Sequence, residues 1–213
     1  MKALGMLEVY SFTTAVCAAD IAAKTANVRV IAFDRTRPKS ADAPAPLVMQ
    51  LKVEGDNASV KAAIDAASSY AKDENMYIVS HVIPRPGEDT EKMAYLIDIN
   101  KDKYNKKLPK SFKGITEEAP DVDFSIGLLE ISGLVASITG LDAMLKAANV
   151  RLIHSEKRLG GRLVTLIIKG SVSAVQAAVD AGAENAKPLG KLYGKAVIAN
   201  PHGEIMKFFD YEV

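Results

Sequence analysis

The chain has 213 residues, of which 48% are hydrophobic and 25% are charged, as in ordinary globular proteins able to bury a core. Its formal net charge of +1 and the absence of a basic helix with interleaved aromatic residues argue against a nucleic-acid partner. No apolar run approaches the roughly 20 residues of a membrane span, and the amino terminus lacks a signal-peptide pattern. The single cysteine, Cys17, cannot form an intrachain disulfide, so we expect a cytoplasmic protein.

The first half of the chain predicts the order strand–helix–strand–strand–helix–strand. Apolar and β-branched residues predict strands over 3–9, 28–33, 47–53 and 76–83. Ser11 can cap the first helix, and the second helix begins near Asp56. The predicted buried faces of these helices, at helical spacing, are Phe12, Ala15, Val16, Ala19, Ala22 and Ala23, then Val60, Ala63, Ile64, Ala67 and Ala71.

A different segment separates this unit from the rest of the chain. After Pro86 an acidic start and the spacing of Met93, Leu96 and Ile97 predict one more helix. Residues 100–121 have no periodicity and carry six lysines between 101 and 113, so we read them as a linker.

The second half predicts the same order again. Strands are expected over 125–131, 150–154, 163–169 and 195–199. Ser132 can cap the first helix of this half, and Ser171 starts the second. The predicted buried stripes are Leu134, Val135, Ile138, Leu141 and Leu145, then Val175, Ala178, Val179, Gly182 and Ala186.

The two halves are copies of one unit. Residues 3–31 align with 125–153 at a constant offset of 122, and ten of these 29 pairs are identical. The match resumes at an offset of 115, so the first copy carries seven extra residues between positions 32 and 54. We therefore predict an α/β (α+β) chain of two tandem ferredoxin-like βαββαβ domains: 1–99 with a terminal helix, the linker 100–121, and 122–213.

These repeats resemble a known family, the bacterial microcompartment shell proteins in their tandem, non-permuted form. The resemblance rests on four sets of segments: the openings ALGMLE and SIGLLE, the stretches AADIAAKTANVRV and GLDAMLKAANVRL, the helix GSVSAVQAAVDAGAENA, and the endings VIPRP and VIANPH. It implies a homotrimer with pseudohexameric symmetry, a flat tile that assembles with other shell proteins and has a central pore for small metabolites. A ring of six units can be built from three fused pairs because neighbouring interfaces stay nearly equivalent.

By resemblance, the loop between the second and third strands of each copy lines the pore. The residues expected there are Arg35, Arg37, Pro38, Lys39 and Ser40, together with Arg158, Leu159, Gly160, Gly161 and Arg162. Two adjacent glycines let the backbone come close to a symmetry axis, although a Gly-Gly pair is also an ordinary hairpin turn.

The charge of these loops predicts which metabolites pass. The first loop, 34–46, has one surplus positive charge and the second, 156–164, has two, so three chains place nine around the opening. We expect a basic mouth that concentrates anionic metabolites, an effect that salt screens over about 10 Å. The alternative is that the arginines only keep the loops solvated.

The resemblance also places residues at the tile edge: Lys24, Lys146, Arg85 and, where the second copy departs from the motif arginine, Asn200. Lys24 and Lys146 also sit near helix C-termini, where a cation is favourable against the helix dipole.

Other reactive residues predict no active site. Some tandem shell proteins hold an iron–sulfur cluster at the pore, but neither pore loop has a cysteine, and mid-helix Cys17 is expected to be a buried thiol. His81, His154 and His202 lack the spacing of a metal site. Glu8 and Glu130 occupy equivalent positions in the two copies, which argues for a structural role at each ring interface rather than for paired catalytic carboxylates.

The sequence therefore predicts a structural protein of the bacterial microcompartment shell, without enzymatic activity, cofactor, metal, nucleic-acid or membrane partner. The alternative is a small-molecule-binding regulatory protein, because duplicated ferredoxin-like domains also bind ligands and a fold does not determine a function.

Overall fold

The computed structural model describes residues 2–40, 42–87, 90, 122–156, 159, 160 and 162–209. They form two compact units. The first contains the described residues up to Tyr10, those from Thr14 to residue 90, and the late segment His202–Phe208. The second contains Ser11–Thr13, the described residues from 122 to Pro201, and Phe209. Each unit therefore includes a short segment from the opposite half of the sequence.

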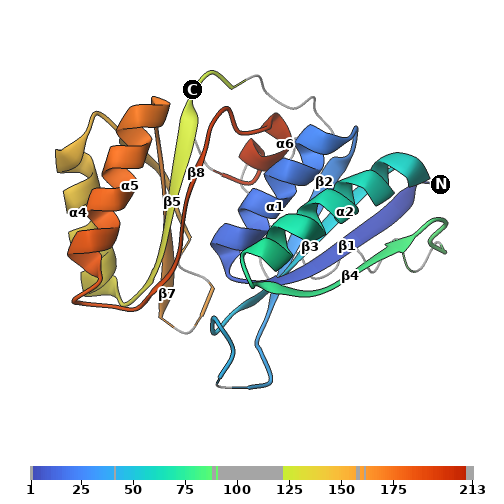
Figure 1. Ribbon diagram of the computed structural model, residues 1–213, viewed down its shortest axis with the longest axis horizontal. Helices are drawn as coiled ribbons and strands as arrows, with labels where there is room; N and C mark the ends of the chain where they lie inside the picture. The colour runs from blue at the N-terminus through green and yellow to red at the C-terminus, as the bar shows by residue number, and fades with distance from the viewer. Residues whose placement is uncertain are drawn as a thin grey trace, which may run out of the picture. The chain divides into compact units, whose positions relative to one another are not determined.

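The first copy has the predicted element order (Figure 1). Its elements are β1 (Ala3–Tyr10), α1 (Phe12–Thr25), β2 (Arg29–Thr36), β3 (Val48–Gly55), α2 (Asn57–Asp73) and β4 (Tyr77–Ile83). The strands form one antiparallel sheet in the order β2-β3-β1-β4. All the residues predicted to be buried in these two helices are buried.

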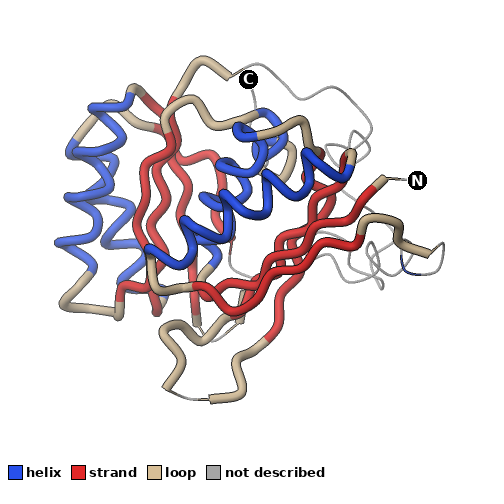
Figure 2. Tube along the Cα trace, turned by 45° about the vertical axis from the view of Figure 1, so that its right-hand side comes forward, coloured by secondary structure: helices blue, strands red, loops and turns tan. Residues whose placement is uncertain are grey.

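The second copy repeats this arrangement. Its elements are β5 (Ser125–Ser132), α4 (Leu134–Ala147), β6 (Arg151–Glu156), β7 (Leu163–Gly170), α5 (Val172–Ala186) and β8 (Leu192–Ile198), followed by the short α6 (Gly203–Met206). The sheet order is β6-β7-β5-β8, and Figure 2 shows the strands and helices of each copy. The tandem ferredoxin-like fold is confirmed. The last strand starts at Leu192, three residues before the predicted 195.

Glycines let the second helix of each copy lie close to its sheet. Gly5 in β1 and Gly127 in β5 are equivalent, and both face apolar helix residues. A Cβ on Gly127 would lie 2.5 Å from Val179 Cγ2 and 2.6 Å from Val175 Cγ1. Only a residue without a side chain fits at this position.

The helix starts confirm two predictions and correct one. Asp56 accepts a hydrogen bond from Ser59 N at 2.9 Å, and Ser171 accepts one from Ala174 N at 3.3 Å, so both cap their helices. The predicted cap Ser132 is wrong: Gly133 occupies the N-cap position of α4, with φ of 96°. Ser132 is still part of β5, and its Oγ accepts from Lys191 N instead.

The predicted buried stripe of α4 is also wrong within the described chain. Of its five residues, Leu141 packs against the core, whereas Leu134, Val135, Ile138 and Leu145 are exposed. The face that α4 buries consists of smaller residues and one methionine: Ala136, Ser137, Gly140 and Met144. Small residues permit the close crossing of α4 and α5, where a Cβ on Gly182 would meet Met144 Cγ at 2.4 Å.

The seven extra residues of the first copy lie in one hairpin. The strand β2 has eight residues where β6 has six, and the connection to β3 runs from 37 to 47 where the equivalent one runs from 157 to 162. Two of the extra residues therefore extend the strand, so that Arg35 pairs with Met49 and Thr36 with Val48. The other five lengthen the loop.

The predicted terminal helix with Met93, Leu96 and Ile97 and the predicted linker 100–121 lie outside the described residues. Among the helices that are described, none is long and apolar enough to cross a membrane.

Cys17 is buried in α1 as predicted, hydrogen-bonded to Tyr70 of α2. Burial raises the pKa of the Cys17 thiol to about 12, against a hydrogen bond from Tyr70 that lowers it. Because the folded pKa lies above the ordinary value of 9.0, this thiol favours the folded state below pH 9, and the contribution is lost as the pH rises toward 12. A thiol that stays protonated at neutral pH is a poor metal ligand and nucleophile.

We predict that Gly127→Ala lowers the free energy of unfolding by about 1–3 kcal/mol, because the added methyl group displaces α5 from its sheet. Urea denaturation followed by circular dichroism measures the change. Gly87→Ala is the matched control, since its nearest neighbour, Thr90 Oγ1, is 3.8 Å from the new Cβ. Equal midpoints for the two variants would contradict the packing argument.

We also predict that Cys17 resists alkylation at pH 8 in the native protein and reacts readily after unfolding in guanidinium. The raised pKa leaves about a thousandfold less thiolate than an ordinary thiol has. Mass spectrometry after iodoacetamide treatment measures the modified fraction. Cys17→Ser combined with Ser69→Cys supplies an exposed thiol on α2 for comparison. Equal native-state rates for the two thiols would show that Cys17 is accessible.

Candidate functional site

The first predicted pore loop is an exposed cationic hairpin. Arg35 lies at the end of β2, and Arg37, Lys39 and Ser40 follow in the loop, all exposed, with Pro38 half-buried. The residue of opposite charge that starts this segment, Asp34, is buried and pairs with buried Lys52 of β3. Its charge is therefore neutralised below the surface. Of the described loop residues, three exposed cations face one exposed carboxylate, Asp42.

The second predicted pore loop is shorter and more tightly turned. Gly160 has φ of 84° and Arg162 has φ of 63°, and Leu163 N donates to Gly160 O at 3.1 Å. Arg162 is exposed, whereas Leu159 is buried. Arg162 O accepts from Gly133 N at 2.9 Å, which ties the loop to the start of α4. Arg158 and Gly161 lie outside the described residues.

The acidic residue at the base of each loop is buried in both copies. Glu156 is the counterpart of Asp34 at the offset of 122, and its Oε2 lies 3.7 Å from His154 Nε2. Glu156 is the last paired residue of β6, whereas β2 pairs for two more residues after Asp34. The buried acid therefore leaves the described exposed cations, Arg35, Arg37 and Lys39 in the first loop and Arg162 in the second, without its charge beside them at the surface.

The predicted tile-edge lysines are held by ion pairs along their helices. Lys24 Nζ lies 2.6 Å from Asp20 Oδ2, and Lys146 Nζ lies 2.6 Å from Asp142 Oδ2. Asp20 is buried and also accepts from His202 N at 2.7 Å, so Lys24 is fixed more firmly than Lys146, whose partner is exposed. These i,i+4 pairs orient both ammonium groups at the C-terminal ends of α1 and α4.

Arg85 and Asn200 occupy equivalent places just after the last strand of each copy, and both are exposed. Asn200 has φ of 44°, a left-handed conformation that asparagine tolerates better than most residues. The segment that starts at His202, two residues later, belongs to the first unit.

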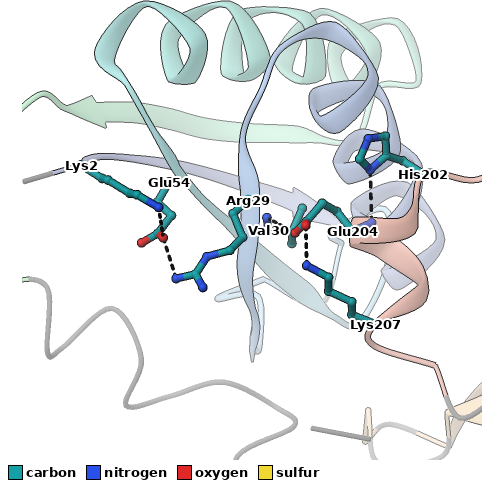
Figure 3. A network of polar contacts seen from close by, with 7 residues as sticks. All are labelled: Lys2, Arg29, Val30, Glu54, His202, Glu204 and Lys207. Atoms are coloured by element: carbon teal, nitrogen blue, oxygen red, sulfur yellow. Dashed lines mark hydrogen bonds and ion pairs between the residues drawn. The ribbon is translucent and has the colours of Figure 1, made fainter. Parts of the chain in front are cut away.

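The late segment is bound to the first unit by a carboxylate on α6 (Figure 3). Glu204 Oε2 accepts from Val30 N at 3.0 Å, and Lys207 Nζ donates to Glu204 Oε1 at 2.5 Å. The ring of Phe208 packs edge-on against Phe33, with centroids 4.9 Å apart. The edge strand β2 therefore has a neighbour that the sequence had not predicted.

Beside this network lies a small polar cavity of about 240 Å³. It is lined by Lys2, Asn27, Val28, Arg29, Glu54, Gly55, Asp56 and Glu204. Three of its charged groups pair with one another: Glu54 Oε1 lies 3.3 Å from Lys2 Nζ and 2.6 Å from Arg29 Nη2 (Figure 3). Ligand sites are mostly apolar with a few convergent polar groups, so this cavity does not favour the regulatory alternative.

Glu130 is a buried carboxylate of the second unit that accepts several hydrogen bonds. It lies in β5 and is fully buried, with Oε2 accepting from Ser11 Oγ at 2.6 Å and from Thr13 N at 2.9 Å, and Oε1 accepting from Phe12 N at 3.2 Å. The carboxylate thus caps the N-terminus of α1, where unpaired N–H groups and the helix dipole favour a negative charge. Within the described part of the chain, no group of three or more metal-binding side chains is present.

Comparison with known proteins identifies the family to which this architecture belongs. The BMC domain model matches residues 3–86 and again 125–201. The carboxysome assembly protein CcmO of Synechococcus elongatus (strain ATCC 33912 / PCC 7942 / FACHB-805) is 32% identical over 204 residues, which are 96% of this chain and 67% of CcmO. The bacterial microcompartment shell protein EutM of Escherichia coli (strain K12) is 45% identical over 85 residues, which are 40% of this chain and 87% of EutM.

A microcompartment protein from Desulfitobacterium hafniense DCB, known from its crystal structure, aligns over 97% of this chain and 99% of its own, with a TM-score of 0.38 and 22% identity. The resemblance predicted from the repeated openings and the two AANVR-like stretches is confirmed by the two domain matches. The chain belongs to the BMC-domain family, and it is a structural shell protein of a bacterial microcompartment with two BMC domains in one polypeptide.

Proposed function

We propose that three copies of this chain form a pseudohexagonal tile whose central pore admits small anionic metabolites to the compartment. The observation that carries this proposal is the presence of two units with one topology in a single chain. Units that are alike can occupy quasi-equivalent positions around an axis, and three pairs complete a ring of six. Domain boundaries at residues 99 and 122 are part of the same proposal.

The hairpins between the second and third strands are the proposed pore lining. Gly160 has a left-handed backbone conformation, with φ of 84°, and lies in a tight turn. A glycine turn of this kind allows the backbone to approach a symmetry axis closely. Because Asp34 is buried against Lys52, the exposed surplus of the first loop is two positive charges rather than the one counted from sequence. A basic opening raises the local concentration of anions and lowers that of cations.

The edges of the tile are the proposed contacts with other shell proteins. Lys24, Lys146, Arg85 and Asn200 lie at ends of elements, and each is exposed or half-exposed in the described chain. Their polar side chains suit the polar, solvent-accessible rim of a contact between tiles that must form repeatedly across a sheet. EutM and the shell protein PduA of Salmonella typhimurium, which is 46% identical over 83 residues, are named as shell proteins, which supports partners of the same class.

The assembly state gives the first test. Sedimentation equilibrium of the purified chain should give three times its mass of 22.8 kDa. A monomer at every concentration studied would refute the proposed tile.

Reversing the pore charge should reverse the preference for anions. In shells assembled with Arg37→Glu, Arg158→Glu and Arg162→Glu, we expect anion entry to fall by about tenfold relative to neutral solutes at low salt, and the difference to shrink at high salt. Stopped-flow measurement of substrate entry into loaded shells provides the rate. Lys61→Glu, an exposed charge on α2, is the control. Unchanged anion selectivity in the triple variant would rule out the basic pore.

Removing the edge lysines should impair sheet formation and leave the tile intact. We expect Lys24→Ala with Lys146→Ala to sediment like the unmodified protein but to form few or no extended sheets in electron micrographs. Lys61→Ala with Lys191→Ala removes the same number of exposed ammonium groups elsewhere. Normal sheets from the edge variant would show that these lysines do not join tiles.

A further inference from the structure

The two hairpins proposed to line the pore differ in the basic group that lies beside their buried acid. In the first hairpin, formed by β2 and β3, Asp34 pairs with Lys52. In the second hairpin, formed by β6 and β7, Glu156 Oε2 lies 3.7 Å from His154 Nε2. The side chain of this histidine is 14% exposed and that of the glutamate 5%, so both groups lie largely out of water.

The two arrangements are related by an exchange between directly opposite positions. Ala32 is opposite Lys52 in the first hairpin, and His154 is opposite Ile167 in the second. At the offsets of 122 and 115, Ala32 corresponds to His154 and Lys52 corresponds to Ile167. The second copy therefore has an apolar residue where the first has its cation, and a basic residue at the position across from it. A basic group remains near the buried acid, but it is an imidazole instead of an ammonium.

This exchange makes the charge beside the acid depend on pH. A lysine that is paired with a carboxylate stays charged throughout the neutral range, whereas histidine side chains change their charge between about pH 5 and 8. Burial disfavours a charged imidazole, and a carboxylate within ion-pair distance favours it. Only the second hairpin therefore has a base whose charge changes in the physiological range.

A second buried carboxylate lies on the same face of this sheet. Side chains of directly opposite residues lie on one face, and Glu130 and Glu156 are both opposite Thr165. His154 is opposite Ile167, two positions along β7 from Thr165, so it shares this face. The carboxylate of Glu130 is bonded to the start of α1, and its negative charge also favours a protonated imidazole.

The cations on this face of β5, β6 and β7 lie farther along the strands. Lys169 is opposite Arg151, two positions beyond Ile167, which is about 7 Å along a strand. The Lys169 ammonium lies over the ring of Phe124, 5.0 Å from its centroid. The ring of Phe209, which lies 5.5 Å from that of His154, carries no charge. Since the interaction between charges weakens with distance, the carboxylate at 3.7 Å outweighs these cations.

We propose that His154 makes the anion selectivity of the second hairpin depend on pH, because its protonated form neutralises the charge of Glu156. Glu156 is the last paired residue before the loop 157–162, which belongs to the proposed pore lining. A buried charge is screened less than an exposed one, so it still contributes to the potential at the opening. With protonated His154, three chains lose the effect of three negative charges around the pore, and anions are attracted more strongly. This inference rests on the proposed pore and names its regulation.

The stability of the chain tests the ion pair without any pore. The pair exists only while the imidazole is protonated, so its stabilisation is present in acid and is lost as the pH rises. We expect the urea midpoint of the unmodified protein to exceed that of His154→Gln by more at pH 5.5 than at pH 8.5. The control His81→Gln changes an exposed histidine of β4 and should keep the pH dependence of the unmodified protein. The same pH dependence in His154→Gln would overturn the proposal.

Entry of solutes into assembled shells tests the effect on selectivity. The probes are a sulfonate dye, whose own charge is constant over this range, and a neutral solute of similar size. At low salt, we expect the entry rate of the dye relative to the neutral solute to rise about twofold or more between pH 8 and pH 6. In His154→Gln this ratio should stay constant. The double variant His154→Ala with Ile167→Lys reproduces the first hairpin's arrangement and should give the higher ratio at both pH values.

The outcomes separate this regulation from the pore itself. A ratio that does not change with pH in unmodified shells would overturn the role of His154, while the pore stands if Arg37→Glu with Arg158→Glu and Arg162→Glu still slows anion entry. If neither pH nor these arginine substitutions affect anion entry, the proposed pore fails and this inference fails with it.

Discussion

The structure depends on one buried carboxylate. Glu130 is fully buried, and a charge in that position is stable only when hydrogen-bond donors surround it. The donors come from Ser11, Phe12 and Thr13, which are 117–119 residues away in sequence. The same contact starts α1 and makes Ser11–Thr13 part of the second unit. A local cap then becomes a long-range connection that no single repeat could make alone.

Duplication gives that contact an equivalent in the other copy. Glu8 corresponds to Glu130, and the start of α4 corresponds to the start of α1. The equivalent helix residues differ in exposure: Leu134 and Val135 are 60% and 68% exposed, whereas Phe12 and Thr13 are 3% and 4% exposed. The two copies therefore share one fold but not one set of contacts.

The two copies have diverged where their surroundings differ. The first hairpin has seven more residues than the second and a buried ion pair, Asp34 with Lys52. Because Asp34 is buried, the exposed residues of this hairpin carry more positive charge than its formal net charge indicates. Asp20 is buried and accepts from His202, whereas its counterpart Asp142 is exposed. Glu204 and Phe208 add a covering to the edge strand β2. Fusion of two domains allows such differences, because each domain then has its own sequence.

The sequence by itself determined the element order, the repeat, the caps at Asp56 and Ser171, and the buried faces of α1, α2 and α5, since these follow from local periodicity and short-range hydrogen bonds. It could not determine what covers an apolar stripe. Leu134, Val135 and Ile138 have the spacing of a buried face, yet the chain buries Ala136, Gly140 and Met144 instead. Only the tertiary structure decided this, along with the partners of Glu130 and Glu204, because these contacts join residues more than a hundred positions apart.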